Sequence, residues 1–229
     1  MKKVMLGLFL GTVLLTGCSS NEIEGNISVD NDEAIYAYVE GSGKNIDSLE
    51  AKTSDGSIFK GEKNGDDFQI AIPFLGVDQN VTVTFKNDDS SLDKDVTIDA
   101  KEKIDDYENF AYMMNSVISS INDNAKTSFP ESVDDGFMDV ASENGVTTTV
   151  NVYDGNIIGL EMRTEGDANQ ELPTILAAFQ GVYEAENKRV AEAYNNILES
   201  KEETSFTSNG YVFNFEYNGD TLFADVYKD

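Results

Sequence analysis

The reactive side chains of this sequence are one cysteine and many carboxylates, and histidine is absent. Without histidine there is no Ser-His-Asp triad, no Cys-His pair and no histidine-bound zinc. Catalysis would have to use carboxylates, lysine, tyrosine or a Ser-Lys pair. A glycosidase needs two carboxylates across a cleft, one with a raised pKa, and no pair stands out among the 43 acidic residues. We therefore expect no enzyme activity and assign no catalytic residue.

The single cysteine, Cys18, follows a segment with the order of a secretory signal. Lys2 and Lys3 give this segment a positive start, Val4–Leu15 is a mostly apolar run, and small residues precede the cysteine. A positive start, a short apolar run and a small-residue cleavage site are typical of a signal peptide. The apolar run is shorter than the roughly 20 residues that a membrane-spanning helix needs.

The sequence Leu15-Thr16-Gly17-Cys18 resembles the lipobox of bacterial lipoproteins. The resemblance implies that residues 1–17 are a signal peptide and that a diacylglycerol is attached to the Cys18 thiol. Cys18 would become the N-terminus of the mature chain and could carry a further acyl group such as palmitate. Two acyl chains hold a protein stably at a membrane. The alternative is an ordinary secretory signal with an incidental cysteine.

Charge restricts the partners of the exported chain. The net charge is −27, and removal of the signal takes away two lysines and no acid, which gives −29. Nucleic-acid binding needs clustered Lys and Arg, so we expect no nucleic-acid partner. Charged partners should be basic or divalent cations. Hydrophobic residues make up 40% and aromatic residues 10% of the sequence, a composition that indicates folded domains rather than disorder.

Adjacent carboxylates suggest calcium sites, because calcium takes oxygen ligands from acidic loops. The first such cluster contains Asp30, Asp32 and Glu33, which we select as candidate metal ligands. It lacks the glycine and the later glutamate of an EF-hand loop. On so acidic a chain, a solvated loop is the competing interpretation. Similar pairs occur at Asp66-Asp67, Asp88-Asp89 and Asp134-Asp135.

Residues 18–25 are short and polar and are expected to be a lipidated tether. Residues 26–100 are expected to form an all-β domain, because short alternating segments are separated by turn signals such as Asp55-Gly56 and Asn64-Gly65. About seven such strands predict a β-sandwich. The expected strands are Asn26–Asp30, Ala34–Glu40, Ile46–Thr53, Ser57–Glu62, Asp66–Ile72, Asn80–Lys86 and Asp93–Asp99.

Within that domain, Gly65–Phe74 followed by Asn80–Phe85 resembles the bacterial Ig-like modules of surface proteins. Those modules often contain a strand of the form G-x-F-x-I-x-x-P and then a V-T-V-T strand. The resemblance implies a sandwich that serves as a spacer or adhesion module. It brings no catalytic residues.

Residues 101–229 are expected to form an α+β domain. Apolar residues at steps of three and four predict helices at about 104–125 and 172–200. The apolar face of the second lapses at Glu186-Asn187, where we expect the helix either to bend or to emerge into solvent. Pro130 is expected to open a short helix with Val133, Phe137 and Val140 on one side. The turns Asp154-Gly155 and Asn218-Gly219 predict two hairpins.

Helix and hairpin alternate twice in this half. We therefore predict two αββ units that share one antiparallel sheet, with helices on one face. One face of the strand Gly210–Tyr217 is aromatic and is expected to be core under a helix, although an exposed stripe could bind peptide or glycan. Its members are Tyr211, Phe213, Phe215 and Tyr217, and Asn214 and Glu216 lie on the other face, which we expect to be solvated.

The sequence thus predicts a two-domain α+β lipoprotein held on the extracytoplasmic face of the cell membrane. Few prolines, no tryptophan and many Lys, Asn and Asp residues favour a low-GC Gram-positive host; the alternative is a Gram-negative cell, in which Ser19 after the cysteine would permit sorting to the outer membrane. The expected function is binding of an envelope or surface protein, with the membrane contacted through the lipid on Cys18 and no other cofactor. The alternative is a lipoprotein that binds calcium or a small ligand and serves a transporter or sensor.

Overall fold

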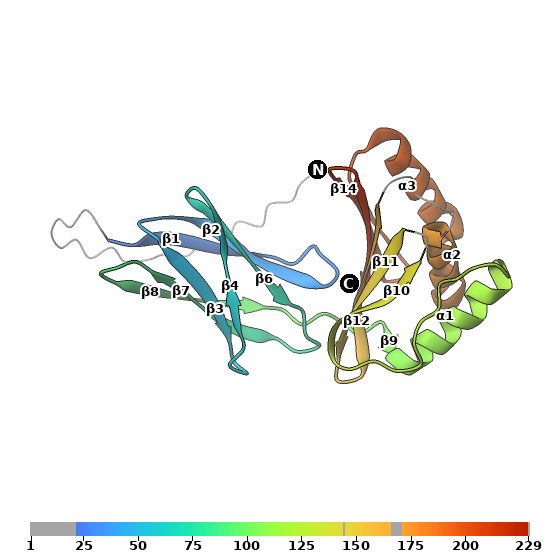
Figure 1. Ribbon diagram of the computed structural model, residues 1–229, viewed down its shortest axis with the longest axis horizontal. Coiled ribbons are helices and arrows are strands. Elements are labelled where there is room, and N and C mark those ends of the chain that lie inside the picture. The colour runs from blue at the N-terminus through green and yellow to red at the C-terminus, as the bar shows by residue number, and fades with distance from the viewer. Residues whose placement is uncertain (1–21, 144, 166–170, 229) are drawn as a thin grey trace.

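In a computed structural model of the chain, residues 22–143, 145–165 and 171–228 are described. The fold is mixed α+β: two four-stranded antiparallel sheets come first, then a seven-stranded antiparallel sheet with three helices (Figure 1). The first part contains β1 (Glu24–Asp30), β2 (Tyr36–Lys44), β3 (Ser48–Thr53), β4 (Ile58–Lys60), β5 (Glu62–Asn64), β6 (Asp67–Pro73), β7 (Gln79–Lys86) and β8 (Ser91–Ile98). The second contains β9 (Asp105–Asp106), α1 (Tyr107–Ile121), β10 (Gly136–Glu143), β11 (Val146–Tyr153), β12 (Asn156–Glu165), α2 (Glu171–Tyr183), α3 (Asn187–Ser200), β13 (Thr204–Ser208), β14 (Tyr211–Asn218) and β15 (Thr221–Lys228).

The first two sheets, which we call the sandwich, enclose one apolar core. Their strand orders are β1-β2-β6-β5 and β4-β3-β7-β8. Alternate residues point inward, as in β7, where Val81, Val83 and Phe85 are buried. Phe68 of one sheet meets Phe85 of the other edge to face, with ring centroids 5.2 Å apart. The alternating pattern therefore located most of the strands and gave their buried faces correctly.

The expected strand Ser57–Glu62 is wrong as a single element. It divides at Gly61 into β4, which pairs with β3, and β5, which pairs with β6 in the other sheet. At the division the Gly61 N–H donates to the Leu49 carbonyl at 3.1 Å. A Cβ on Gly61 would lie about 2.5 Å from the Leu49 side chain, so only glycine lets the chain cross so close to the core.

The seven-stranded sheet has the order β10-β11-β12-β15-β14-β13, and β9 pairs with part of β12. Each half of the sheet is a hairpin-connected meander of three strands, and the halves meet where β12 pairs with β15. The Asp154-Gly155 turn joins β11 to β12 with both φ angles positive, at 50° and 70°, as expected for a tight hairpin. The repeat is therefore helix followed by three strands, not the two strands that we predicted.

The short helix expected after Pro130 is wrong, because Gly136–Glu143 is strand β10. Gly136 has φ +113°, which a helix does not accept. Phe137 lies on one side of this strand and packs against Tyr36 of the sandwich, whereas Val140 joins the core under the helices. A bulge between Asp139 and Ala141 shifts the register by one residue. Three apolar residues spaced by three and four were too few to define a helical period.

The helices cover one face of the seven-stranded sheet (Figure 1). Helix α1 begins where the Asp106 carboxylate accepts hydrogen bonds from the first-turn N–H groups. The predicted second helix is two helices, α2 and α3, with the break near the expected position. Tyr211, Phe213 and Phe215 are buried beneath the helices, and Tyr217 packs against the same core. The prediction that this aromatic stripe is core is confirmed.

Candidate functional site

The sandwich meets the seven-stranded sheet on the face away from the helices (Figure 1), and we call this junction the joint. Its centre is a small apolar contact in which Ala34 and Ile35, from the loop after β1, are buried against Val212 and Tyr227. The backbone of β12 lies very close to the sandwich loop there: a Cβ on Gly159 would collide with the Ala34 carbonyl group. This face was expected to be solvated, and in the joint that expectation is wrong.

Three side chains of the sheet hold backbone carbonyls of the sandwich. Asn151 is 1% exposed, and its Nδ2 donates to the Phe74 carbonyl at 2.7 Å and more weakly to the Ile35 carbonyl at 3.4 Å. Asn214 Nδ2 and the Tyr227 hydroxyl both donate to the Asp32 carbonyl, at 2.8 and 3.0 Å. The two Asn151 bonds are buried, and a buried carbonyl without a donor costs about 1–3 kcal/mol. They therefore hold the loop more firmly than the bonds to Asp32, which is exposed.

Lys101 joins the two parts from the connecting segment. Its Nζ donates to the Asn31 carbonyl at 2.8 Å and lies 3.6 Å from the centroid of the Tyr227 ring. The same ammonium group is 4.8 Å from the centroid of the Phe74 ring. A cation over aromatic faces is attracted by the ring quadrupole, so the lysine binds the sandwich and the sheet together.

Beside the joint lie four carboxyl groups, which we call the acidic cluster: Glu33, Glu161, Glu216 and Asp225. Asp225 is on β15 and is 4% exposed, and its cross-strand partners are Glu161 on β12 and Asn214 on β14. The Glu33 carboxyl group, from the sandwich loop, lies close enough to Asp225 to affect its protonation. Burial, and then the negative charge of Glu33 and Glu161, raises the pKa of Asp225 well above its usual value.

The two other members are half-buried. Burial raises the pKa of Glu161, and the nearby Arg163 guanidinium partly opposes that rise. Burial and the charge of Glu33 raise the pKa of Glu216. Arg163 itself lies 3.7 Å from Asp139, at an exposed position. Arg163 therefore partly offsets the crowding of negative charge around Glu161.

A hollow of about 440 Å³ lies at the joint, between the connecting segment and the end of β12. Its lining includes three lysines and two acids, Glu102 and Asp154, a small excess of positive charge on a strongly acidic chain. Lys228 Nζ is 3.2 Å from a Glu102 carboxylate oxygen, and Lys103 Nζ donates to Asn156 Oδ1 at 3.0 Å. Tyr153 and Ile158 give the hollow an apolar side. Its chemistry suits a small anion with an apolar portion.

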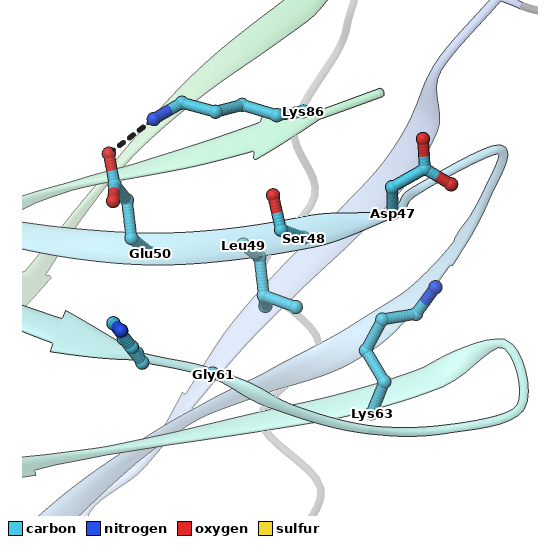
Figure 2. Close-up of a pocket in the computed structure, with 8 residues that line it drawn as sticks. Asp47, Ser48, Leu49, Glu50, Gly61, Lys63 and Lys86 are labelled. Carbon is cyan, nitrogen blue, oxygen red and sulfur yellow. Dashed lines mark hydrogen bonds and ion pairs between the residues drawn. The ribbon is translucent and has the colours of Figure 1, made fainter. Parts of the chain in front are cut away.

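A second hollow, of about 420 Å³, opens at the edge of the sandwich (Figure 2). Lys86 forms an ion pair with Glu50 at 2.6 Å across its rim. Lys63 donates to the Ile46 carbonyl, and Leu49 forms the floor beside Gly61. Two of the three lysines of this hollow are thus already engaged, Lys86 by Glu50 and Lys63 by a backbone carbonyl.

The residues predicted from the lipobox, Leu15, Thr16, Gly17 and Cys18, lie outside the described residues. The candidate metal ligands Asp30, Asp32 and Glu33 have separate roles. The Asp30 carboxylate accepts the Asp32 N–H at 3.0 Å, whereas Glu33 belongs to the acidic cluster near Asp225. In the part of the chain that the structure describes, no group of three or more Asp, Glu, His or Cys side chains could hold a metal ion. Calcium binding stays a prediction.

The sequence analysis did not single out three residues of this site, Asp225, Glu161 and Asn214. A signal for Asp225 was present, because it is the only charge within the apolar run Leu222–Tyr227. A lone acid in such a strand is either exposed on a solvated face or buried with a partner. Its partner Glu33 lies 192 positions earlier and could not be identified from spacing.

The described residues offer little support for a catalytic site. Two pairs have Ser-x-x-Lys spacing, Ser57 with Lys60 and Ser91 with Lys94. Ser91 and Lys94 are three apart on β8, so their side chains point to opposite faces. The Ser57 hydroxyl donates to Asp55. Asp225 has the raised pKa of a general acid, but it is sealed between the sheet and the sandwich loop.

No protein-family model matches the chain, and no curated protein is similar to it at a significant level. None of the helices within the described ranges is long and apolar enough to cross a membrane.

Proposed function

We propose that this chain is a lipid-anchored, extracytoplasmic binding protein of the bacterial cell envelope, without catalytic activity. In this proposal the sandwich is a bacterial Ig-like spacer and the sheet with its helices carries the recognition surface. The observation that carries the proposal is the joint. It ties the recognition part to the spacer through buried hydrogen bonds, so that the spacer sets the orientation of the part beyond it.

The position of the joint supports this role. Strand β1 begins at the end of the sandwich remote from the seven-stranded sheet (Figure 1), where Asn45 Nδ2 donates to the Glu22 carbonyl at 2.8 Å. The loop at the other end of β1 enters the joint. Seven residues of strand span about 23 Å. An anchor on Cys18 would therefore hold the helical layer away from the membrane surface.

Charge supports a protein partner with a basic surface. The whole chain carries a net charge of −27, or −29 once the signal with its two lysines is removed. Such a surface repels phosphate-rich polymers and attracts basic proteins. An envelope or surface protein with exposed lysines or arginines fits it best.

The test is lysine cross-linking in intact host cells that make the full-length chain, followed by pull-down and mass spectrometry. The proposal expects one dominant envelope partner, cross-linked through exposed lysines of the helical side such as Lys126 and Lys188. Cross-links confined to sandwich lysines such as Lys52 and Lys60 would contradict the spacer role. Cys18→Ser is the matched control, and it should release the chain from the membrane fraction and abolish the cross-links.

A second function, binding of a small ligand for a transporter or sensor, is favoured by the lysine-lined hollow at the joint. The test is calorimetry of the purified chain with inorganic phosphate and with short carboxylates, comparing wild type with Lys103→Ala. Lys94→Ala, on β8 of the sandwich and outside the lining of the hollow, is the control. Saturable binding that only Lys103→Ala removes would favour this function over the first. Calorimetry with calcium on the metal-stripped chain tests the cation version.

A further inference from the structure

The two edges of the seven-stranded sheet differ in how they are protected against pairing with another chain. Strand β10 forms one edge and has a bulge between Asp139 and Ala141, whereas β13 forms the other and pairs with β14 without a break in register. Edge strands are commonly protected by bulges, charges, proline or short length. The sequence of β13, TSFTS, contains neither charge nor proline. Within the described residues, β13 is therefore the unprotected edge of this sheet.

The outer strands of the sandwich, by contrast, carry such protection. Strands β4 and β5 have only three residues each. Strand β1 contains Glu24 and Asp30, and β8 contains two aspartates and a lysine. Short length and charge both disfavour pairing with a further strand. The search for a strand-pairing site therefore leads to β13.

The turn after β13 fixes which of its backbone groups face outward. The Asn209-Gly210 turn has positive φ angles, 51° and 79°, and Ser208 is paired across it. In such a two-residue hairpin, the pair beside the turn exchanges both backbone hydrogen bonds, and hydrogen-bonded and non-hydrogen-bonded pairs alternate beyond it. The N–H and C=O groups of Ser205 and Thr207 therefore point away from β14.

A contact from helix α3 agrees with this direction. Arg189 Nη1 donates to the Thr207 carbonyl at 2.9 Å, and its guanidinium group lies 4.9 Å from the centroid of the Phe206 ring. Arg189 thus covers one of the four outward groups. The N–H groups of Ser205 and Thr207 and the Ser205 carbonyl face the open edge, where both residues are exposed. These three groups are the hydrogen-bonding positions for an added strand.

The side chains along the edge indicate what an added strand would carry. Phe206 is half-buried on the helix side and stacks on Phe213, with ring centroids 5.3 Å apart. On the other side, the register with β14 places Glu203, directly before β13, opposite Glu216. Like charges opposite each other repel, and among the described residues neither carboxylate forms an ion pair. An added strand would meet an aromatic ring at one position and two carboxylates three positions away.

We propose that β13 binds an extended, basic segment of the partner protein as a further antiparallel strand of the sheet. An apolar side chain of that segment faces Phe206, and a lysine or arginine three positions later faces Glu203 and Glu216. The net charge of −27 favours the same basic occupant. In strand addition, backbone hydrogen bonds give affinity and alternate side chains give specificity. This inference rests on the proposed binding function and names the segment that is bound.

The probe is a capped heptapeptide, Thr-Thr-Val-Thr-Thr-Lys-Thr, in which valine precedes lysine by three positions. It is titrated into the isotope-labelled full-length chain with Cys18→Ser, and binding is followed through the backbone amide signals. We expect saturable shifts at Ser205 and Thr207. Ser205→Pro removes an outward N–H but no hydrogen bond to β14, and it should weaken binding about tenfold.

A charge exchange tests the carboxylate contact separately. Glu203→Lys should reject the lysine peptide and bind the same peptide with glutamate in place of lysine, and this variant serves alone if Ser205→Pro does not fold. Glu131→Lys, an equal change of charge at an exposed position before β10, is its control. Arg189→Ala uncovers the Thr207 carbonyl and should strengthen binding about fivefold. Lys188→Ala, which removes a neighbouring charge, should have a smaller effect.

Absence of peptide binding, equal binding by wild type, Ser205→Pro and Glu203→Lys, or amide shifts confined to other strands would overturn the proposal. So would a dimer of the free chain that Ser205→Pro dissociates, because a second copy would then occupy the edge. The cross-linking test in cells separates this inference from the proposed function. One envelope partner captured equally by wild type and Ser205→Pro would overturn only the edge site. Peptide binding at β13 without any captured partner would overturn only the proposed function.

Discussion

Substitution of Gly159 by alanine tests whether the joint depends on close backbone contact. The added Cβ would lie 2.7 Å from the carbonyl carbon of Ala34 and nearer still to its oxygen, whereas ordinary contact begins at about 3.4 Å. The sandwich loop must therefore retreat by at least about 0.7 Å to clear the carbon, and further to clear the oxygen. The φ angle of Gly159 is not positive, so backbone strain does not contribute.

The cost follows from what the retreat does to nearby hydrogen bonds. A movement of 0.7 Å away from the sheet would lengthen the bond from Asn214 to the Asp32 carbonyl from 2.8 to 3.5 Å, the limit of a useful bond. Overpacking costs about 1–3 kcal/mol and each lost hydrogen bond about 1 kcal/mol. We expect Gly159→Ala to reduce the free energy of unfolding by about 3 kcal/mol, and thus the Tm by about 6–12 °C.

The assay is thermal unfolding by calorimetry, with hydrogen exchange of residues 31–35 as a local readout. Gly181→Ala in α2 is the matched control, because its Cβ would meet Val117 at an ordinary 3.5 Å and alanine is favoured over glycine in a helix by about 1 kcal/mol. The control should be neutral or stabilising. If Gly159→Ala unfolds at the wild-type temperature with unchanged protection of the loop, the description of the joint as a tight contact is wrong.

The remaining predictions concern the helical side. The Tyr107 hydroxyl is buried without a hydrogen-bond partner, so Tyr107→Phe should be neutral or stabilise the chain by up to about 1 kcal/mol, as measured by urea unfolding. In the same assay Tyr183→Phe, which loses a 3.2 Å bond to Asp105, should destabilise by about 1 kcal/mol, and the opposite order would refute this reasoning. Asp106 caps α1 through two backbone N–H groups. Asp106→Ala should therefore cost about 1 kcal/mol, whereas Asp106→Asn, which keeps the cap, should cost much less.

Local patterns in the sequence predicted much of the fold. Alternation located most strands of the sandwich, and the Asp-Gly and Asn-Gly turns located the hairpins, because both signals lie within a few residues. The segments that form α1, α2 and α3 were predicted to be helical from their apolar faces, which are also local signals, although α2 and α3 were predicted as one helix. The aromatic stripe of β14 was correctly assigned to the core, because the two predicted helices each needed a sheet face to pack against.

The errors arose where long-range contacts decide the structure. Strand β10 is an edge strand with a bulge, and β13 has only one large apolar residue, Phe206. Each is held by pairing with a neighbouring strand, β11 or β14, and this tertiary effect overrides local propensity. The joint could not be predicted from the sequence, because it too depends on long-range contacts. Asn151 and Glu33 look like ordinary polar residues until the fold brings the sandwich loop onto the far face of the sheet.

The strand order of the seven-stranded sheet has a consequence for how the chain folds. Strand β15 is the last in sequence but lies in the centre, between β12 and β14. Until Thr221–Lys228 is available, the edges of β12 and β14 remain unpaired, and exposed edges invite association with other chains. The pairing of β12 with β15 also closes a loop of more than 50 residues, and such distant contacts form slowly. Assembly of the sheet should therefore be the late and vulnerable step of folding, whereas the sandwich, whose strands all precede residue 99, can form before it.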